Sequence, residues 1–194
     1  MDFYTVLSER GIVSVNGVRI PVTLLVARCP YRYIMVVEET PEMIEGRIQH
    51  AVIESLLRER GWETEVKLEL TLQDPPATIV GKIDAVNHDN HLIVEIKSGK
   101  RLYGEYVMQL EIYRWMWYRL HGQVYDGEIW FVRNGRIEYR IRPWLRDPQA
   151  MEPIVVSRLR QLLDQLNTPE SLCVRNEYCF LCPLYRRCPA TRRG

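Results

Sequence analysis

Two short apolar segments near the middle of the chain each contain an acidic residue. Residues 81–86 read Gly-Lys-Ile-Asp-Ala-Val and contain Asp84, and residues 92–97 read Leu-Ile-Val-Glu-Ile-Lys and contain Glu95 and Lys97. Glu95 and Lys97 are two positions apart, so both side chains point to the same face of a strand. Charged groups in an apolar strand are costly to bury unless they pair or bind a cation. Two carboxylates and an ammonium are the groups that metal-assisted phosphodiester hydrolysis needs.

A salt-bridged hairpin without catalytic function would contain the same three residues, because an aspartate followed by Glu-x-Lys is a short and common pattern. The surrounding residues favour chemistry. Gly81 precedes the first strand, apolar residues fill both strands, and Ser98 and Gly99 follow the lysine. With this context the segment resembles the PD-(D/E)XK nucleases, and among them the RecB-like branch. Ile83 precedes Asp84 where the name-giving motif has proline, a form that is common in RecB-like members.

Two further motifs lie on either side of this segment in the order of the RecB-like nucleases. His50 ends the segment 46–50, Gly-Arg-Ile-Gln-His, where those enzymes often place a helix histidine as an additional metal ligand. Most histidines near an apolar helix face are core or boundary residues. It is the resemblance to the RecB-like nucleases that implies a metal-ligand function for His50. Gln109 and Tyr113 are four residues apart and share one helix face. They match the QxxxY motif that follows the Glu-x-Lys strand in RecB-like nucleases.

The cysteines form a second pattern. Cys179 and Cys182 are a C-x2-C pair, and Cys188 follows after five more residues. Thiolates spaced in this way can face one metal ion or cluster from a tight turn. Three ligands leave one position open, and the candidates for it are Cys29 and Cys173. The spacing alone is equally compatible with zinc and with an iron–sulfur cluster, either [2Fe–2S] or [4Fe–4S].

The order of all these features narrows the resemblance. An early cysteine followed by proline precedes the histidine, aspartate, Glu-x-Lys and QxxxY motifs, and C-x2-C-x5-C comes last. This order resembles the iron–sulfur RecB-like exonucleases and, at this length, the CRISPR-associated family numbered four among the Cas proteins. The resemblance implies an iron–sulfur cluster held by four cysteines, Cys29, Cys179, Cys182 and Cys188. It leaves Cys173 unassigned.

The same resemblance implies an active site and a substrate. The ligands of Mn²⁺ or Mg²⁺ would be His50, Asp84, Glu95 and the backbone carbonyl of Ile96. Lys97 would position or activate the attacking water, and Gln109 and Tyr113 would orient that group or the scissile strand. The implied activity is an exonuclease that digests the ends of single-stranded DNA. Its implied place is the preparation of new spacers beside the CRISPR integrase complex.

Two other functions fit parts of the pattern. A RecB-like repair nuclease outside CRISPR would contain all of the nuclease motifs. A non-catalytic adaptor with an iron–sulfur cluster or zinc would bind DNA and keep the fold and the cysteines. Such an adaptor has no use for the costly trio Asp84, Glu95 and Lys97, so the intact trio favours a nuclease.

Composition sets broad limits on the protein. The 194 residues suit one domain, and 46% hydrophobic and 26% charged residues are typical of a water-soluble globular protein. The formal net charge of +1 means that any basic surface for DNA is local. Five cysteines, an odd number, argue against a disulfide framework. We find no membrane-spanning segment and no signal peptide at Met1, so we expect a cytoplasmic protein. The oligomeric state stays open, a homo-oligomer included.

The elements that must position these residues follow from periodicity and turn signals. We expect an α/β fold with a mixed sheet flanked by helices. Strands are expected at residues 64–73, 77–86, 92–98, 127–133 and 136–142, and around a hairpin at Asn16 and Gly17. Helices are expected at residues 21–37 with a bend at Pro30, from Pro41 to Gly61, at 103–121 and at 147–166. The helix from Pro41 has an apolar stripe made of Met43, Ile44, Ile48, Ala51, Val52, Ser55 and Leu56.

We expect one nuclease domain over residues 1–194. Its RecB-like core would span residues 38–166. Residues 21–37 and 167–194, from the N-terminal helix and the C-terminal tail, would form the lobe that binds the cluster. Such a lobe would join the two ends of the chain and constrain the unfolded state, as other cross-links do.

Overall fold

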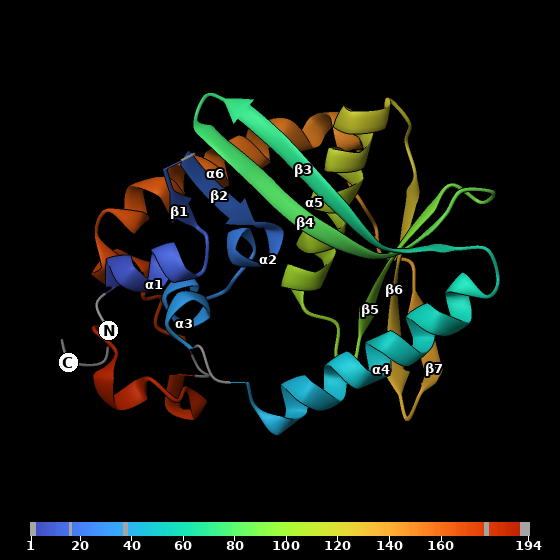
Figure 1. The fold of residues 1–194 in the computed structure, drawn as a ribbon, viewed down its shortest axis with the longest axis horizontal. Helices are drawn as coiled ribbons and strands as arrows, with labels where there is room; N and C mark the ends of the chain where they lie inside the picture. Colours follow the sequence, from blue (N-terminus) through green and yellow to red (C-terminus); the bar gives the residue numbers. More distant parts are fainter. Residues whose placement is uncertain (1–2, 16, 37–38, 177–178, 191–194) are drawn as a thin grey trace. The chain divides into compact units, whose positions relative to one another are not determined.

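A computed structural model describes residues 3–15, 17–36, 39–176 and 179–190 (Figure 1). The chain forms two compact units. The central unit comprises residues 39–70 and 80–153, and the terminal unit comprises residues 1–38, 71–79 and 154–194. Among the described residues, no helix combines the length and the hydropathy needed to cross a membrane.

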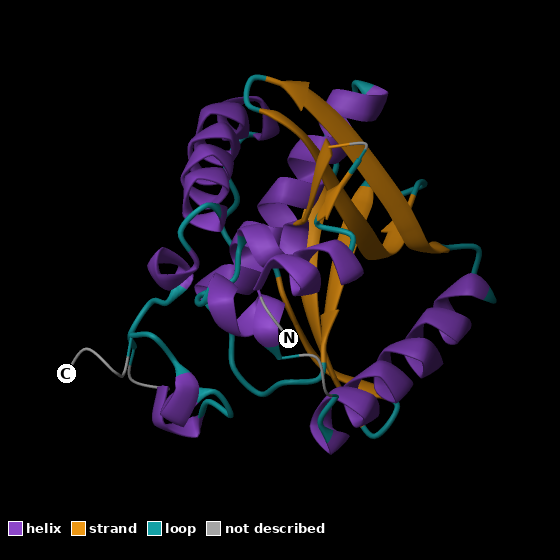
Figure 2. Ribbon diagram, turned by 60° about the vertical axis from the view of Figure 1, so that its left-hand side comes forward, coloured by secondary structure: helices purple, strands orange, loops and turns teal. Residues whose placement is uncertain are grey.

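The central unit is built around a mixed β-sheet, and the expected α/β fold is confirmed. The strands of this sheet are β3 (Glu63–Gln73), β4 (Pro76–Asn87), β5 (Leu92–Lys97), β6 (Asp126–Arg133) and β7 (Arg136–Ile141). The end of β3 and the beginning of β4, within residues 71–79, belong to the terminal unit. β3 pairs with β4, and β4 pairs with β5 in the antiparallel sense. β5 and β6 are parallel, and β6 and β7 are antiparallel. The twist of these strands is visible in Figure 2.

The connections between the strands have clear local causes. Asn134 and Gly135 join β6 to β7 with φ angles of 50° and 68°, as a tight hairpin turn requires. A parallel pair needs a long crossover, and helix α5 (Gly104–His121) provides it between β5 and β6. Gly122 ends this helix in the left-handed conformation, at a φ of 69°. The connection places α5 against β5 and β6.

Helix α4 (Pro41–Arg58) packs on the sheet from the other face. The Thr40 hydroxyl caps it by accepting a hydrogen bond from the Met43 amide at 3.3 Å. Its core contacts come from two α4 side chains and from strands β4, β5 and β6: Ile53, Leu57, Ala85, Leu92, Val94, Ile96, Trp130 and Val132. Neighbouring strand residues point to opposite faces, so Val94 and Ile96 face α4 whereas Glu95 and Lys97 face α5.

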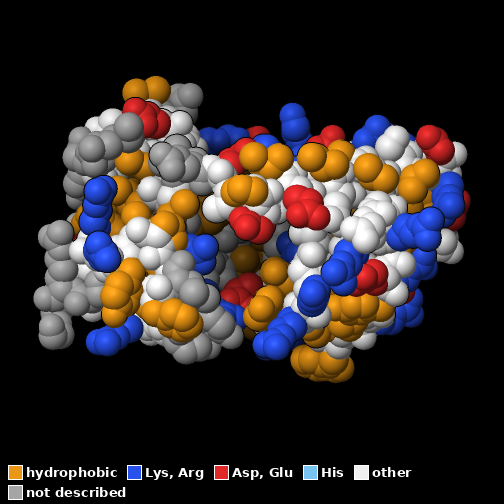
Figure 3. All heavy atoms as spheres, turned by 90° about the horizontal axis from the view of Figure 1, so that it is seen from below, with side chains coloured by type: hydrophobic (Ala, Val, Ile, Leu, Met, Phe, Trp, Pro, Cys, Tyr) orange, Lys and Arg blue, Asp and Glu red, His pale blue; other side chains and the backbone are white. Residues whose placement is uncertain are grey.

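The apolar stripe of α4 is not the side of the helix that packs on the sheet. The side chains of Met43 and Ile48 are 52% and 60% exposed, and the rest of the stripe is exposed as well. The row of hydrophobic side chains along the upper right of Figure 3 lies over α4. The buried side contains Gly46, where an added Cβ would lie 2.8 Å from the Ser98 hydroxyl. Close approach to the end of β5 therefore decides which face of α4 is buried.

The terminal unit consists of short elements from both ends of the chain. Its N-terminal elements are α1 (Phe3–Glu9), β1 (Val13–Ser14), β2 (Gly17–Pro21), α2 (Val22–Leu25) and α3 (Pro30–Met35). Its C-terminal elements are most of α6 (Glu152–Leu166) and the 3-10 helices η2 (Pro169–Leu172), η3 (Cys179–Leu181) and η4 (Tyr185–Arg187). Among these short elements, helix α3 from the N-terminal part contacts η2 from the C-terminal part.

Two expectations for the helices need correction. The helix expected at residues 21–37 is not one bent helix over its described residues 21–36, because Pro21 ends β2 and two short helices, α2 and α3, follow it; residue 37 lies outside the described residues. Pro30 cannot donate a backbone hydrogen bond, so it starts α3 instead of continuing α2. The helix expected at residues 147–166 begins with a 3-10 turn, η1 (Pro148–Met151). Helix α1 was not predicted.

Candidate active site

The candidate site lies where strands β4 and β5 stop pairing. Their paired register runs from Asn87 opposite Leu92 to Ala85 opposite Val94. Beyond it, the Ile96 amide donates to Oδ2 of Asp84 at 2.7 Å. The Asp84 carboxylate thus accepts a hydrogen bond from an amide that lies beyond the paired residues of β4 and β5. This hydrogen bond holds Asp84 at the opening between the two strands.

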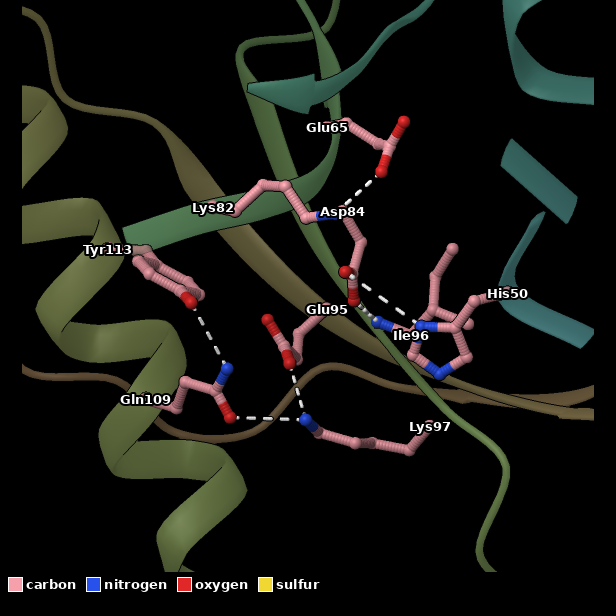
Figure 4. A network of polar contacts seen from close by, with 9 residues as sticks. All are labelled: His50, Glu65, Lys82, Asp84, Glu95, Ile96, Lys97, Gln109 and Tyr113. Atoms are coloured by element: carbon pink, nitrogen blue, oxygen red, sulfur yellow. Dashed lines mark hydrogen bonds and ion pairs between the residues drawn. The ribbon is translucent and has the colours of Figure 1, made fainter. Parts of the chain in front are cut away.

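A chain of polar contacts leads from β5 to α5 (Figure 4). The Lys97 ammonium donates to Oε1 of Glu95 and, at 3.1 Å, to Oε1 of Gln109. The Gln109 amide nitrogen contacts the Tyr113 hydroxyl at 3.2 Å. Glu95 is 2% exposed and Gln109 is 6% exposed, so these contacts are sheltered from water. The structure therefore brings together four residues that the sequence predicted for the site.

Tyr106 is a neighbour of this chain of contacts that the sequence motifs do not include. The Lys97 ammonium lies 4.7 Å from the centroid of its ring. A cation over an aromatic face is attracted by the ring quadrupole. The only sequence signal was the spacing on α5, since Tyr106 precedes Gln109 by three positions and lies on the same side of the helix.

His50 and Asp84 approach each other from α4 and β4. Nδ1 of His50 is 3.9 Å from Oδ1 of Asp84. Glu54 joins them, and one ligand atom from each of the three residues lies within 4.8 Å of the others. The sequence analysis missed Glu54. A signal was present, because a residue four positions after His50 occupies the same helix face.

Burial raises the pKa of both strand carboxyls. The pKa of Asp84 rises to about 6, because desolvation outweighs the attraction of Lys97 and the hydrogen bond from Ile96. The pKa of Glu95 rises to about 7 through desolvation and the nearby charge of Asp84. Oε2 of Glu95 is buried and has no hydrogen-bond partner among the described residues. Hard oxygen donors in such surroundings fit a divalent cation, which would neutralise them.

The other ionisable groups also suit a cation site. Burial and the charge of Lys97 lower the pKa of His50, so its imidazole is neutral and able to act as a ligand. Burial opposes the charge of Lys97, but Glu95 and Asp84 outweigh this effect and raise its pKa. Lys97 is therefore an ammonium at neutral pH. The pKa of Glu54 is raised by burial and by Glu65.

Two of the predicted metal ligands differ in their placement from the compact group on α4 and β4. Glu95 is turned to Lys97 and is not part of that group, although its second oxygen is unpartnered. For Ile96 the structure describes the amide, which is bonded to Asp84. Ligation by its carbonyl stays a prediction.

In the terminal unit, the cysteines of the two chain ends approach each other. The Cys188 thiol donates to the sulfur of Cys173, with the two Sγ atoms 3.7 Å apart. The Cys29 thiol lies 3.9 Å from the carbonyl oxygen of Leu172. Burial, and the contact with Cys188, raise the pKa of the Cys173 thiol to about 12. The residue left unassigned by the sequence is therefore in contact with a predicted cluster ligand.

The C-x2-C pair forms a tight turn, in which the Cys182 amide donates to the Cys179 carbonyl at 2.9 Å. Sγ of Cys179 accepts a hydrogen bond from the Asn176 amide at 3.2 Å. None of the five cysteines is part of a disulfide. The donor chemistry thus fits a soft metal ion or an iron–sulfur cluster, and the predicted set of Cys29, Cys179, Cys182 and Cys188 stays a prediction.

The solved structures that are similar to this chain include two proteins. The protein SSO0001 has a crystal structure with a TM-score of 0.67 at 27% sequence identity, covering 97% of this chain and 94% of that one. A protein from Eubacterium rectale described as "Putative exonuclease" has a TM-score of 0.46 at 15% identity, covering 93% and 65%. No curated protein matches the sequence.

A family profile matches most of the sequence. The profile is described as PD-(D/E)XK nuclease superfamily, and it covers residues 38–189. The matched range includes His50, Asp84, the Glu95-to-Lys97 strand and Gln109. These are the residues that the fold gathers at the opening between β4 and β5. The chain therefore belongs to the PD-(D/E)XK nuclease superfamily.

Proposed function

We propose that this protein is a metal-dependent deoxyribonuclease that digests single-stranded DNA from its ends. The observation that carries the proposal is the buried group of Asp84, Glu95 and Lys97, in a member of a nuclease superfamily. Two carboxyls with raised pKa values beside a charged lysine are expensive for the folded protein. A catalytic function of Asp84, Glu95 and Lys97 would account for their presence in this buried site.

Mn²⁺ or Mg²⁺ would be held by side chains from α4, β4 and β5: His50, Glu54, Asp84 and Glu95. When bound, the cation supplies a Lewis acid for the phosphate and a lower pKa for water. The carbonyl of Ile96 is proposed as a further ligand. The Ile96 amide donates a hydrogen bond of 2.7 Å to the Asp84 carboxylate and holds it in place. Asp84 would therefore need little reorganisation to bind the ion.

Lys97 acts as a hydrogen-bond donor and a positive charge. Its raised pKa keeps it protonated, so it can orient a water oxygen and offset the charge of a phosphate. Gln109 holds the ammonium at 3.1 Å, and Tyr113 in turn contacts Gln109 at 3.2 Å. Gln109 and Tyr113 are therefore positioning residues, which fix the lysine relative to Glu95.

The order of motifs along the chain supports a more specific setting. We propose an iron–sulfur cluster on Cys29, Cys179, Cys182 and Cys188, and a function in preparing CRISPR spacers with the integrase complex as partner. Both rest on the resemblance of the whole motif series, from the early cysteine to C-x2-C-x5-C. A repair nuclease outside CRISPR would share the active site, and it should give the same results in assays of DNA-end digestion.

The test is cleavage of end-labelled single-stranded DNA with Mn²⁺, Mg²⁺ or EDTA, beside a circular single strand and a duplex of the same sequence. We expect metal-dependent loss of the linear strand and survival of the circle. Asp84→Asn should lower the rate by about a hundredfold or more. Asp89→Asn, in the exposed turn between β4 and β5, is the matched control and should retain activity.

Lys97→Met has its own control in Lys100→Met, which changes an exposed lysine three positions later. Only Lys97→Met should lose cleavage while retaining metal binding. DNA binding without cleavage under every metal condition would contradict the nuclease and favour the adaptor. Cleavage of circular single strands at the linear rate would contradict digestion from ends.

A further inference from the structure

The thiol contact between Cys173 and Cys188 has no function in the proposed cluster. Their Sγ atoms are 3.7 Å apart, close to the van der Waals contact of two sulfur atoms. Cys188 is 9% exposed, and Cys173 is partly buried. Neither thiol is part of a disulfide. Two reduced thiols at this distance need only a small movement to form a covalent bond.

The chain holds this pair in place from both sides. Cys173 directly follows η2, and its amide donates to the Glu170 carbonyl at 3.3 Å. Cys188 directly follows η4, where the Arg187 amide bonds to the Leu184 carbonyl at 2.8 Å. Each cysteine therefore directly follows a short hydrogen-bonded 3-10 turn.

We propose that Cys173 is a resolving thiol, which forms a disulfide with Cys188 when the cluster is absent and the protein meets a peroxide. Of the proposed function, this inference uses only one point, that Cys188 is a cluster ligand. The disulfide would remove Cys188 from the ligand set, reversibly. A thiol reductant would then restore the ligand.

The chemistry balances in two steps. The Cys188 thiolate attacks hydrogen peroxide, which leaves a sulfenic acid on Cys188 and releases hydroxide, protonated to water. The Cys173 thiol then gives up its proton as its sulfur attacks the Cys188 sulfur. The S–S bond forms, the S–O bond of the sulfenic acid breaks, and the departing hydroxide takes the proton to become the second water. Overall, two thiols lose two electrons and two protons, and one peroxide is reduced to two waters. Without a resolving thiol, further peroxide would oxidise Cys188 to the sulfinic acid, which thiol reductants do not reverse.

The first test maps the bond in the full-length, cluster-free protein. The protein is treated with a small excess of hydrogen peroxide, free thiols are alkylated, and peptides are separated without reduction and analysed by mass spectrometry. We expect a linked peptide pair that contains Cys173 and Cys188. Cys182→Ser is the matched control, because it removes a thiol of the same tail and should leave this pair linked. A link between Cys179 and Cys182, with Cys173 alkylated, would overturn the proposal.

The second test measures recovery of the ligand set. After peroxide and then dithiothreitol, wild-type protein should take up iron and sulfide as well as untreated protein does. Cys173→Ser should take up little, and its Cys188 should be found as sulfinic acid. Equal recovery in the two proteins would overturn the proposal.

If Cys173→Ser does not fold, mapping of the disulfide in the wild-type protein still tests the proposal. Neither readout uses DNA cleavage. A failed nuclease assay and a failed disulfide assay are therefore separate results, and the Asp84→Asn protein should still form the disulfide.

Discussion

The most informative single residues of this protein are the two buried carboxyls. Burial raises the pKa of Asp84 from 3.8 to about 6 and that of Glu95 from 4.5 to about 7. Between the ordinary and the raised values, the folded state binds more protons than the unfolded state. The free energy of unfolding contributed by these groups therefore falls as pH rises through this window.

The first prediction follows from that sign. Metal-free protein should have a higher melting temperature at about pH 5 than at about pH 8, because the protonated carboxyls tolerate burial. Asp84→Asn removes one of the two titrating groups, so its melting temperature should vary less with pH. Calorimetry in EDTA measures both. A wild-type protein that becomes more stable from about pH 5 to about pH 8 would contradict the raised pKa values.

A second prediction concerns Glu54, the ligand candidate that only the structure identified. Its carboxylate lies with His50 and Asp84 in the group whose ligand atoms are within 4.8 Å. Glu54→Gln keeps the shape but lowers the charge, so Mn²⁺ affinity should fall by roughly 10- to 100-fold. Titration calorimetry measures it. Glu59→Gln, at the exposed end of α4, is the control and should bind Mn²⁺ as the wild type does.

At the level of elements, α5 determines where the lysine points. Gln109 contacts Lys97 at 3.1 Å and Tyr113 at 3.2 Å, and it is 6% exposed. Gln109→Leu leaves the ammonium without this acceptor. We predict a cleavage rate about 10- to 100-fold lower, with Mn²⁺ affinity unchanged. Gln123→Leu, just after α5 and exposed, should match the wild type. Loss of Mn²⁺ binding in Gln109→Leu would show that the residue supports the ligands instead.

Packing of α4 on the end of β5 gives the fourth prediction. A Cβ at Gly46 would lie 2.8 Å from the Ser98 hydroxyl and 3.7 Å from its Cβ. Gly46→Val should therefore destabilise the protein by about 1–3 kcal/mol and displace the helix that carries His50. Gly104→Ala is the control, because nothing lies within 4 Å of its Cβ. Chemical unfolding and the activity of the folded fraction measure both effects. Equal stability of the two variants would contradict the close approach.

For the whole molecule, cation binding should appear as added stability. A ligand that binds only the folded state stabilises it by about 2.7 kcal/mol at a hundred times its dissociation constant. Mn²⁺ should therefore raise the melting temperature of the wild type at about pH 8, where the carboxyls are charged. The Asp84→Asn protein should respond much less. An equal increase in both proteins would place the bound ion elsewhere.

The extent to which the fold was predictable depended on the kind of signal. Turn residues with a specific conformation, such as Asn134 and Gly135, gave the β6–β7 hairpin, and alternating or continuous apolar runs gave β3 to β6. The buried face of α4 does not follow from the sequence, because helix periodicity reports where apolar residues lie and not which side of the helix packs on the sheet. That choice depends on a close approach at Gly46, a long-range contact that no local pattern contains.

The candidate site was predictable where residue type and spacing carry chemistry. The contacts among Glu95, Lys97, Gln109 and Tyr113 follow from strand and helix periods together with motif order. Glu54 was missed because a glutamate on a helix is usually solvated. The contact of Cys173 with Cys188 joins residues 15 positions apart through two irregular segments, for which no periodic rule exists.

The division into two units also sets an order of events during synthesis. The central unit is complete at residue 153, whereas the terminal unit needs residues 154–194. A ribosome adds roughly 5–20 residues per second, and units fold as they emerge. The nascent chain can therefore form the buried group of Asp84, Glu95 and Lys97 seconds before Cys173, Cys179, Cys182 and Cys188 leave the ribosome. Maturation of the cysteine segment comes later, and it can be delayed or fail without undoing the group that formed first.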